Sequence, residues 1–141
     1  MYVMRHFNVQ DIGPDLELHI SEGWVNMEVR WFDCGSAHGI MGRSTFLPPV
    51  SEAGTSKHAP HTHPNAEEII YVLSGFGRGL SGSEWFELRP GDVLYVPKDE
   101  PHSVENLSRV DTLELLFVYA PATSLAEAGH IPITSAPPLS E

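Results

Sequence analysis

Apolar and polar residues alternate along much of this 141-residue chain. Residues 15–21 alternate leucine and isoleucine with polar side chains, and residues 24–32 repeat the alternation with valine, methionine and tryptophan. A period of two residues is typical of a half-buried β-strand, because successive side chains point to opposite faces. Residues 40–49 predict a third strand that ends at its two prolines. Shorter apolar runs between turn residues predict further strands at 68–75, 84–88, 91–97, 101–106 and 112–121, with a glycine-rich hairpin at 75–82.

Helix signals are nearly absent, so the pattern as a whole predicts an all-β protein of about nine or ten short strands in a β-barrel or jelly roll. Twelve glycines and twelve prolines fit the many turns that such a fold needs. Ser124 and Glu127 have the spacing of a helix capping box, which we interpret as coincidental. Residues 121–141 are rich in proline, serine, threonine and alanine and predict a packed-down or frayed tail.

The charge and cysteine content narrow the class of protein. The formal net charge is −11, which argues against a nucleic-acid-binding surface, because such surfaces cluster lysine and arginine. The single cysteine, Cys34, excludes an intrachain disulfide. No apolar run approaches the length of a membrane span, and residues 1–13 lack the apolar core of a signal peptide. We therefore expect a soluble cytoplasmic protein that binds neither nucleic acid nor membrane.

Three histidines and one glutamate carry the candidate chemistry. His61 and His63 are two residues apart, a spacing that places both imidazoles on the same face of a strand. Glu68 opens the next predicted strand, and His102 follows a proline-bounded turn far along the chain. Three imidazoles and one carboxylate suit one divalent transition metal ion, such as Mn²⁺, Fe²⁺, Ni²⁺, Co²⁺ or Zn²⁺.

The spacing of these residues resembles the first motif of the cupin superfamily, G-(x)5-H-x-H-(x)3,4-E-(x)6-G. Thr55 stands where that motif begins with glycine. The pattern also permits Glu67 as the acidic residue, but the distance to the final glycine favours Glu68. The other motif positions are filled by His61, His63, Glu68 and Gly75.

The second cupin motif, G-(x)5-P-x-G-(x)2-H-(x)3-N, is matched with Asp99 in place of its inner glycine. The resemblance covers about residues 40–120 and implies a cupin-type double-stranded β-helix, a jelly-roll barrel. Residues 1–141 would then form a single cupin domain, with N-terminal strands in 1–34, a barrel core at about 35–120 and a tail in 121–141. The resemblance also implies that the metal is bound by His61, His63, Glu68 and His102. The second motif is filled by Gly91, Pro97, His102 and Asn106.

Several further residues lie near these motifs. We interpret His58 as a solvated loop histidine, because its spacing from His61 puts it on the opposite face of a regular strand; support of a metal ligand is the lesser alternative. Arg43 is a candidate for binding a substrate carboxylate, with an ordinary surface arginine as the alternative. Tyr95 is a second catalytic candidate, with a core aromatic as the alternative, and Tyr71 is expected to pack away from the metal. The remaining histidines are expected to be ordinary surface or core residues, although one of them precedes a strand that could line the barrel: His6, His19, His38 and His130.

The resemblance implies a metal-dependent enzyme that acts on a small oxygenated substrate, which is a carboxylate, a hydroxy-carbonyl or an enolisable compound. An anionic or enolisable substrate is favoured, because a divalent ion with one carboxylate ligand retains net positive charge. Dioxygenase chemistry is slightly favoured over decarboxylase, isomerase or lyase chemistry. The alternatives are a cupin that binds a small molecule without catalysis and a structural jelly roll without metal. We also expect a homodimer, because the strands predicted in residues 16–32 have an edge that a second chain could cover.

Overall fold

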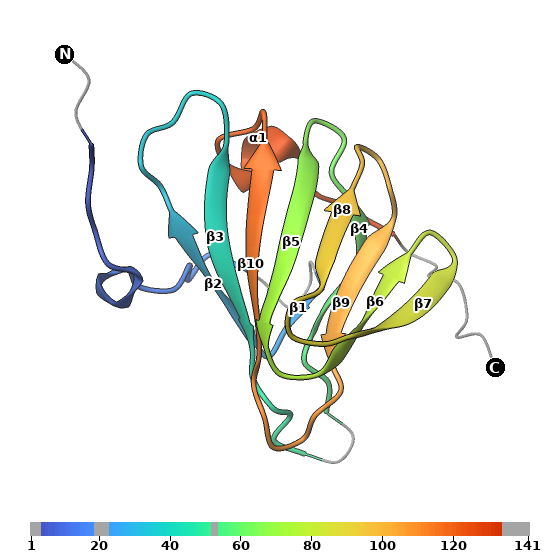
Figure 1. The fold of residues 1–141 in the computed structure, drawn as a ribbon. Helices are drawn as coiled ribbons and strands as arrows, with labels where there is room; N and C mark the ends of the chain where they lie inside the picture. Colours follow the sequence, from blue (N-terminus) through green and yellow to red (C-terminus); the bar gives the residue numbers. More distant parts are fainter. Residues whose placement is uncertain (1–3, 19–22, 52–53, 134–141) are drawn as a thin grey trace.

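The computed structural model describes residues 4–18, 23–51 and 54–133. Its strands form two antiparallel sheets that face each other as a jelly roll (Figure 1), so the all-β prediction is confirmed. The six-stranded sheet contains, in order, β1 (Trp24–Val25), β4 (Lys57–Thr62), β9 (His102–Asn106), β6 (Gly77–Ser81) and β7 (Glu84–Leu88), with β11 (Ile131–Pro132) also beside β4. The five-stranded sheet contains β2 (Met27–Phe32), β3 (Ile40–Phe46), β10 (Leu113–Ala120), β5 (Glu67–Ser74) and β8 (Val93–Val96). Two short helices, η1 (Val9–Asp11) and α1 (Leu125–Ala128), lie outside the sheets.

The core lies between the two sheets and follows the two-residue alternation of the sequence. In β5 the side chains of Glu68, Ile70 and Val72 are buried, while the residues between them are exposed. In β10 every second residue from Leu113 to Tyr119 is buried in the same way. Because β5 pairs with β10, these two strands form one wall of the barrel interior.

The chain changes sheets at Asn26, within the segment that the sequence predicts as one continuous strand. Asn26 has a φ of 54°, a left-handed conformation that asparagine tolerates better than most residues. Its side-chain amide donates hydrogen bonds to the carbonyl of Pro48 (3.1 Å) and to the hydroxyl of Ser56 (2.7 Å). This corner places β1 in one sheet and β2 in the other, so both sheets contribute to the same end of the core.

One strand prediction and the hairpin prediction are wrong in the described residues. The strand predicted for residues 15–21 is a turn at Leu16 and Glu17, where the backbone N–H of Glu17 donates to the Asp15 side chain. The rest of that prediction, including His19, lies outside the described residues. The segment 75–82 is mostly strand β6 rather than a hairpin turn, and β6 pairs with both β7 and β9.

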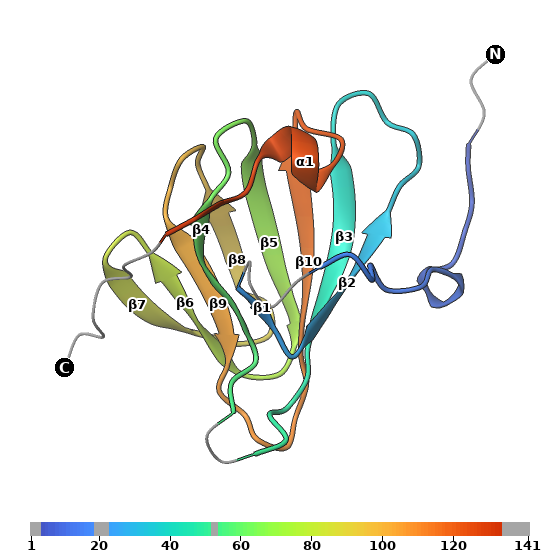
Figure 2. The same cartoon turned by 180° about the vertical axis from the view of Figure 1, so that it is seen from behind.

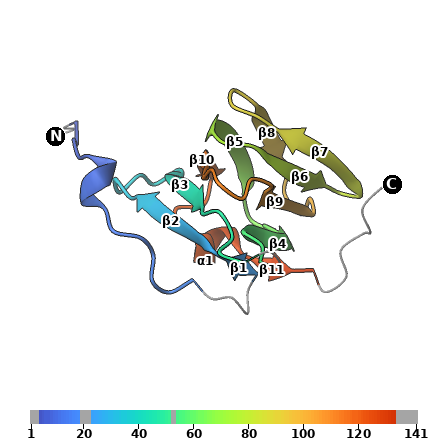
Figure 3. The same ribbon diagram turned by 90° about the horizontal axis from the view of Figure 1, so that it is seen from below.

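Residues 121–133, the C-terminal segment, cross from the five-stranded sheet to the six-stranded sheet (Figure 2). The segment leaves β10, forms α1, and then pairs with β4 as β11. The hydroxyl of Ser124 accepts the backbone N–H of Glu127, so the capping-box spacing is a real helix cap and its interpretation as coincidental is wrong. Figure 3 shows β1, β4 and β11 lying side by side, since β1 and β11 pair with successive parts of β4.

The sequence contains no apolar run of membrane-spanning length. In the part of the chain that the structure describes, no helix is long and apolar enough to cross a bilayer.

Candidate metal centre

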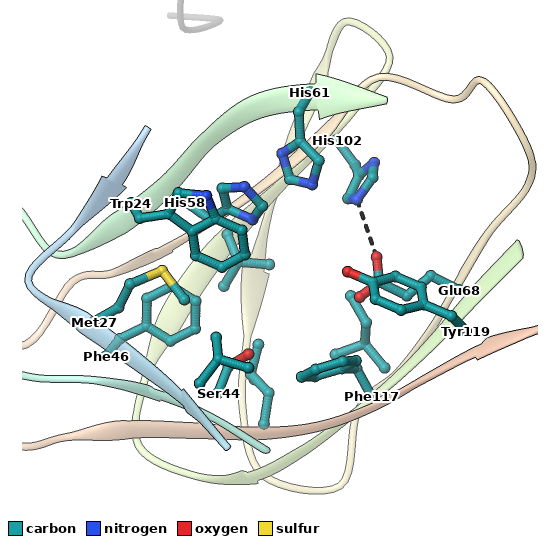
Figure 4. Close-up of a pocket in the computed structure, with 14 residues that line it drawn as sticks. Trp24, Met27, Ser44, Phe46, His58, His61, Glu68, His102, Phe117 and Tyr119 are labelled. Carbon is teal, nitrogen blue, oxygen red and sulfur yellow. Dashed lines mark hydrogen bonds and ion pairs between the residues drawn. The ribbon is translucent and has the colours of Figure 1, made fainter. Parts of the chain in front are cut away.

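The four predicted metal ligands come together where the two sheets meet. His61 on β4 lies directly opposite His102 on β9, and His63 follows the last residue of β4. Glu68 reaches the same place from β5 in the other sheet (Figure 4). All four side chains are buried, which is unusual for polar groups that lack a common partner.

The hydrogen bonds of the three imidazoles fix their tautomers. In each ring Nδ1 faces a backbone carbonyl, which can only accept a hydrogen bond, so Nδ1 carries the proton. In His61 and His63 the Nε2 atoms are then left with lone pairs, as in histidines that bind a metal. Nε2 of His102 instead lies 3.1 Å from Oε1 of Glu68 and donates a hydrogen bond to it, so this nitrogen would release its proton to bind a metal. The three bonds run from His61 to the Ala59 carbonyl (2.7 Å), from His63 to the Gly129 carbonyl (2.6 Å) and from His102 to the Glu100 carbonyl (2.9 Å).

The Nε2 atoms of the three histidines and the carboxylate of Glu68 converge on one place. The Nε2 atoms of His61 and His63 are 3.1 Å apart, and Oε1 of Glu68 lies 3.5 Å from Nε2 of His63 and 3.1 Å from Nε2 of His102. With Nδ1 protonated in both rings, Nε2 of His61 and Nε2 of His63 face each other without a proton between them. A cation between these atoms removes their repulsion, so the donor set fits a divalent transition metal ion.

The pKa values of the ligands depend on burial and on the single carboxylate. Burial lowers the pKa of His61, and neighbouring histidines, His58 first, lower it further. Burial also lowers the pKa of His63, although Glu68 acts in the opposite direction. For His102 burial is again the largest effect, but the hydrogen bond and charge of Glu68 outweigh it and raise the pKa. His61 and His63 are therefore neutral and available as ligands near pH 7.

His58 is a part of this cluster that the sequence interpretation missed. It lies in β4, not in a solvated loop, and its side chain is buried. The pairing of β4 with β9 shifts register between His58 and His61, and the extra residue of this β-bulge turns both side chains toward the interior. Pro60 is the signal that could have revealed the bulge, because proline inside a paired strand is largely confined to bulges and edges.

The ring of His58 stacks between two others. Its centroid is 3.8 Å from that of Trp24 and 3.6 Å from that of His61. Its Nε2 atom lies 2.8 Å from Nε2 of His130, which belongs to the C-terminal segment. Burial, followed by the nearby His130, lowers the pKa of His58. Both histidines were expected to be bystanders, and both instead pack against a candidate ligand.

A cavity extends from the metal cluster into the barrel and is mostly apolar. It contains about 30 Å³ of free space, which is room for about two water molecules. A larger ligand therefore needs side chains to move, and the half-buried, flexible Met27 is well placed to do so. Among the described residues, neither lysine nor arginine lines the cavity. Figure 4 labels most of the lining residues: Trp24, Met27, Val29, Ser44, Phe46, His58, His61, Glu68, Ile70, His102, Val104, Leu115, Phe117 and Tyr119.

The structure places the other candidates outside this cavity. Arg43 forms a salt bridge with Glu114 at 2.9 Å on the outer face of the five-stranded sheet. Tyr95 is 58% exposed on the same face and donates a hydrogen bond to Glu67. Tyr71 is also exposed there, as expected for a residue that faces away from the metal cluster. Neither Arg43 nor Tyr95 is kept as a catalytic candidate. His38, which the sequence placed before a possible barrel-lining strand, is exposed as well.

Tyr119 is a site residue that the sequence analysis did not single out. Its buried hydroxyl lies 3.4 Å from Nε2 of His63, and on β10 it is paired with Glu68 of β5. Burial, and then the charge of Glu68, raise the pKa of Tyr119 well above its ordinary value. The phenol is therefore neutral and able to donate a hydrogen bond beside the metal cluster.

Several proteins are similar in sequence to part of this chain. A Streptomyces cyaneus protein named polyketide synthase CurC is 28% identical over 107 residues, covering 76% of this chain and 64% of that protein. An oxalate-binding protein of Thermotoga maritima is 36% identical over 72 residues, covering 51% of this chain and 54% of that protein. An uncharacterised protein of Methanocaldococcus jannaschii is 39% identical over 66 residues, covering 47% of this chain and 53% of that protein. The chain spans about half to two thirds of the length of these curated relatives.

Solved structures share the fold over most of the chain. The polyketide cyclase RemF of Streptomyces resistomycificus superposes with a TM-score of 0.73 at 18% identity, covering 95% of this chain and 88% of the cyclase. A predicted oxalate decarboxylase of Thermotoga maritima superposes with a TM-score of 0.64 at 24% identity, covering 84% of this chain and all of that one. The sequence profile of the cupin domain matches residues 50–119, which contain all four candidate ligands. This profile match shows that the chain belongs to the cupin superfamily.

Proposed function

We propose that this cupin is a metal-dependent enzyme acting on a small, enolisable carbonyl compound with a largely apolar body. The observation that carries the proposal is the convergence of three imidazole Nε2 atoms and one carboxylate oxygen at the edge of an apolar cavity. His61, His63, Glu68 and His102 would hold Mn²⁺, Fe²⁺, Co²⁺, Ni²⁺ or Zn²⁺. A divalent ion at this position would supply Lewis-acid polarisation of a substrate oxygen.

The cavity lining supports a substrate that carries at most one negative charge. With Glu68 as a ligand, a bound divalent ion would carry one net positive charge, which can balance one negative charge on a substrate. The described residues of the lining add neither lysine nor arginine, so a second negative charge would be buried beside apolar walls without a paired cation. Phe46, Phe117 and Trp24 offer aromatic surfaces for a flat apolar molecule. We therefore propose a hydroxy-carbonyl or enolisable compound that is neutral or singly charged, which narrows the class expected from the sequence.

Tyr119 and Ser44 would orient the polar part of such a molecule. The neutral hydroxyl of Tyr119 can donate a hydrogen bond to a substrate oxygen beside the metal cluster. Ser44 contributes a hydroxyl on the opposite wall of the cavity, where it is surrounded by apolar residues. The substrate would thus be held by hydrogen bonds at its oxygen atoms and by apolar contacts along its body.

The names of the relatives support a reaction class. CurC is named a polyketide synthase and RemF a polyketide cyclase, and both names refer to compounds with repeated carbonyl groups. We propose ring closure or isomerisation of an enolisable carbonyl compound in preference to the dioxygenase chemistry favoured by the sequence. Decarboxylation of a dianion such as oxalate is disfavoured by the lining of the cavity.

The function can be tested on protein purified without a chelating column. Elemental analysis is expected to find one divalent transition metal ion per chain. A screen of enolisable diketones, polyketones and hydroxy acids, followed by mass spectrometry and oxygen uptake, is expected to give a product of unchanged mass, or one that has lost water, without consumption of oxygen. Oxygen consumption would support the dioxygenase alternative, and binding without turnover would support a non-enzymatic binder. A metal-free protein would contradict the proposal.

We also propose that the chain forms a homodimer, through a different surface from the N-terminal edge expected from the sequence. Ile69 and Tyr71 on β5 lie opposite Tyr95 and Val93 on the edge strand β8, and all four side chains are exposed on one outer face. These four side chains are uncharged in a chain of net charge −11, so two copies can approach here with little charge repulsion.

Light scattering at micromolar concentration is expected to give the mass of a dimer for the wild type and of a monomer for Val93→Asp. Val110→Asp, at an exposed position beyond β9 and outside this face, is the control and is expected to remain dimeric. A wild-type monomer, or a Val93→Asp dimer, would contradict the proposal.

A further inference from the structure

We infer that the C-terminal segment completes the metal centre, because its Gly129 carbonyl and His130 imidazole position the ligands His63 and His61. This inference rests on the proposed metal binding but concerns residues outside the matched family profile, which ends at residue 119. The segment thus adds contacts from outside the profile to ligands that lie within it.

The first link joins Gly129 to His63. Nδ1 of His63 donates a hydrogen bond of 2.6 Å to the Gly129 carbonyl, which fixes the tautomer that leaves Nε2 free. Gly129 ends α1 with a φ of 82°, a conformation that favours glycine. A Cβ atom there would come within 2.8 Å of the ring of Pro64, the residue that follows His63. The Asn65 backbone N–H also donates to the Ala128 carbonyl, so a second hydrogen bond holds the loop after β4 against the end of α1.

The second link joins His130 to His61 through His58. The Nε2 atoms of His130 and His58 are 2.8 Å apart, an ordinary length for a hydrogen bond. Together with His61 these two histidines form a second group of nitrogens that lie close to one another. We assign the His58–His130 pair as a hydrogen bond, because 2.8 Å is shorter than the separation of about 3.3 Å between two nitrogens bound to one tetrahedral ion. The bond holds His58 in the stack, where its ring covers the face of His61 at 3.6 Å between centroids and limits rotation of that ligand.

Backbone pairing supports both links. Ile131 and Pro132 of β11 lie opposite Thr62 and His61 of β4, immediately after His130 in the chain. The C-terminal segment therefore contacts His61 and His63 in three ways. β11 pairs with β4, the end of α1 bonds His63, and His130 acts on His61 through the ring of His58. Metal ligands that are held by such surrounding contacts bind their ion more tightly, since less ordering is required on binding.

The test measures cobalt(II) binding, by the absorption spectrum of the bound ion and by competition with a chelator. His130→Ala is expected to weaken cobalt binding about 10-fold and to change the spectrum, because His61 is no longer held in one orientation. His130→Gln, whose amide can still form a hydrogen bond with His58, is expected to recover part of the affinity and the wild-type spectrum. His38→Ala, at an exposed position outside the cluster, is the control and is expected to match the wild type.

The outcomes separate this inference from the proposed function. If the wild type binds cobalt and His130→Ala equals it in affinity and spectrum, the positioning role is refuted while the metal proposal stands. If the wild type does not bind cobalt, the metal proposal fails and the inference fails with it. Thermal unfolding monitors the fold. If His130→Ala does not fold, the comparison of His130→Gln with the wild type decides: a lower cobalt affinity or a changed spectrum supports positioning, and identity in both refutes it.

Discussion

Glu68→Gln is expected to lower the affinity of the protein for a divalent transition metal by about 100-fold or more. The substitution keeps the shape of the side chain but removes the only carboxylate among the four candidate ligands. The Glu68 oxygen lies 3.1 Å from Nε2 of His102 and 3.5 Å from Nε2 of His63, and its charge is what compensates a buried cation. Loss of a group that merely supports a metal ligand costs about 10- to 100-fold, and loss of the ligand itself should cost more. Calorimetric titration of metal-free protein with Mn²⁺, Co²⁺ or Zn²⁺ measures the change.

Glu67→Gln is a closely matched control, because the two glutamates are neighbours on one strand and face opposite sides of it. Glu67 is exposed and accepts a hydrogen bond from Tyr95, outside the barrel. We expect this variant to bind metal as the wild type does. His102→Ala should lose most of the metal as well, since it removes a ligand from the other sheet. Unchanged affinity in Glu68→Gln, or an equal loss in both glutamine variants, would contradict the ligand assignment.

Tyr119→Phe is expected to lower turnover of an accepted substrate by about 100-fold without loss of metal. The ring remains and continues to pack against Trp31 and Phe117, whose centroids lie 6.1 Å and 5.2 Å away. What is lost is a neutral hydroxyl next to His63, in a buried site where a single positioned hydrogen-bond donor contributes about 100- to 1,000-fold to reactions of carbonyl groups. Steady-state kinetics with elemental analysis of the same sample measures both quantities.

Tyr95→Phe is the control for this second prediction. Tyr95 is on the outer face of the barrel and its hydroxyl is bonded to Glu67, so its removal should leave turnover and metal content unchanged. The pair of variants also decides between the tyrosine suggested by the sequence and the one found in the structure. A large loss of turnover in Tyr95→Phe, or none in Tyr119→Phe, would reverse this assignment.

The sequence predicts best where the strand is regular. In β5 the alternation correctly places Glu68, Ile70 and Val72 inside and Glu67 outside, because a regular strand has only two faces. The motif spacing likewise selects four residues that the fold brings together from both sheets. Such predictions succeed because a two-residue period or a motif contains the required information locally.

The errors occur where long-range contacts override the local pattern. His58 was assigned to the wrong face because the register shift before His61 exists only in the pairing with β9. His130 could not be linked to His58 from the sequence, since 72 residues separate them and no motif spans that distance. The alternating residues at 15–18 form a turn, because local alternation alone does not provide a partner strand.

The position of the C-terminal segment in the chain has a consequence for the order of folding. Gly129 follows His63 by 66 residues. During synthesis it is added after all four candidate ligands and after every described strand except β11. Contacts between residues so far apart form after the local ones, because closing a long loop costs more entropy. A nascent chain that ends before residue 129 would already expose the four ligands but not the groups that hold His61 and His63. Tight metal acquisition should therefore coincide with completion of the domain during synthesis, and an unfinished barrel would bind its ion weakly and exchange it readily.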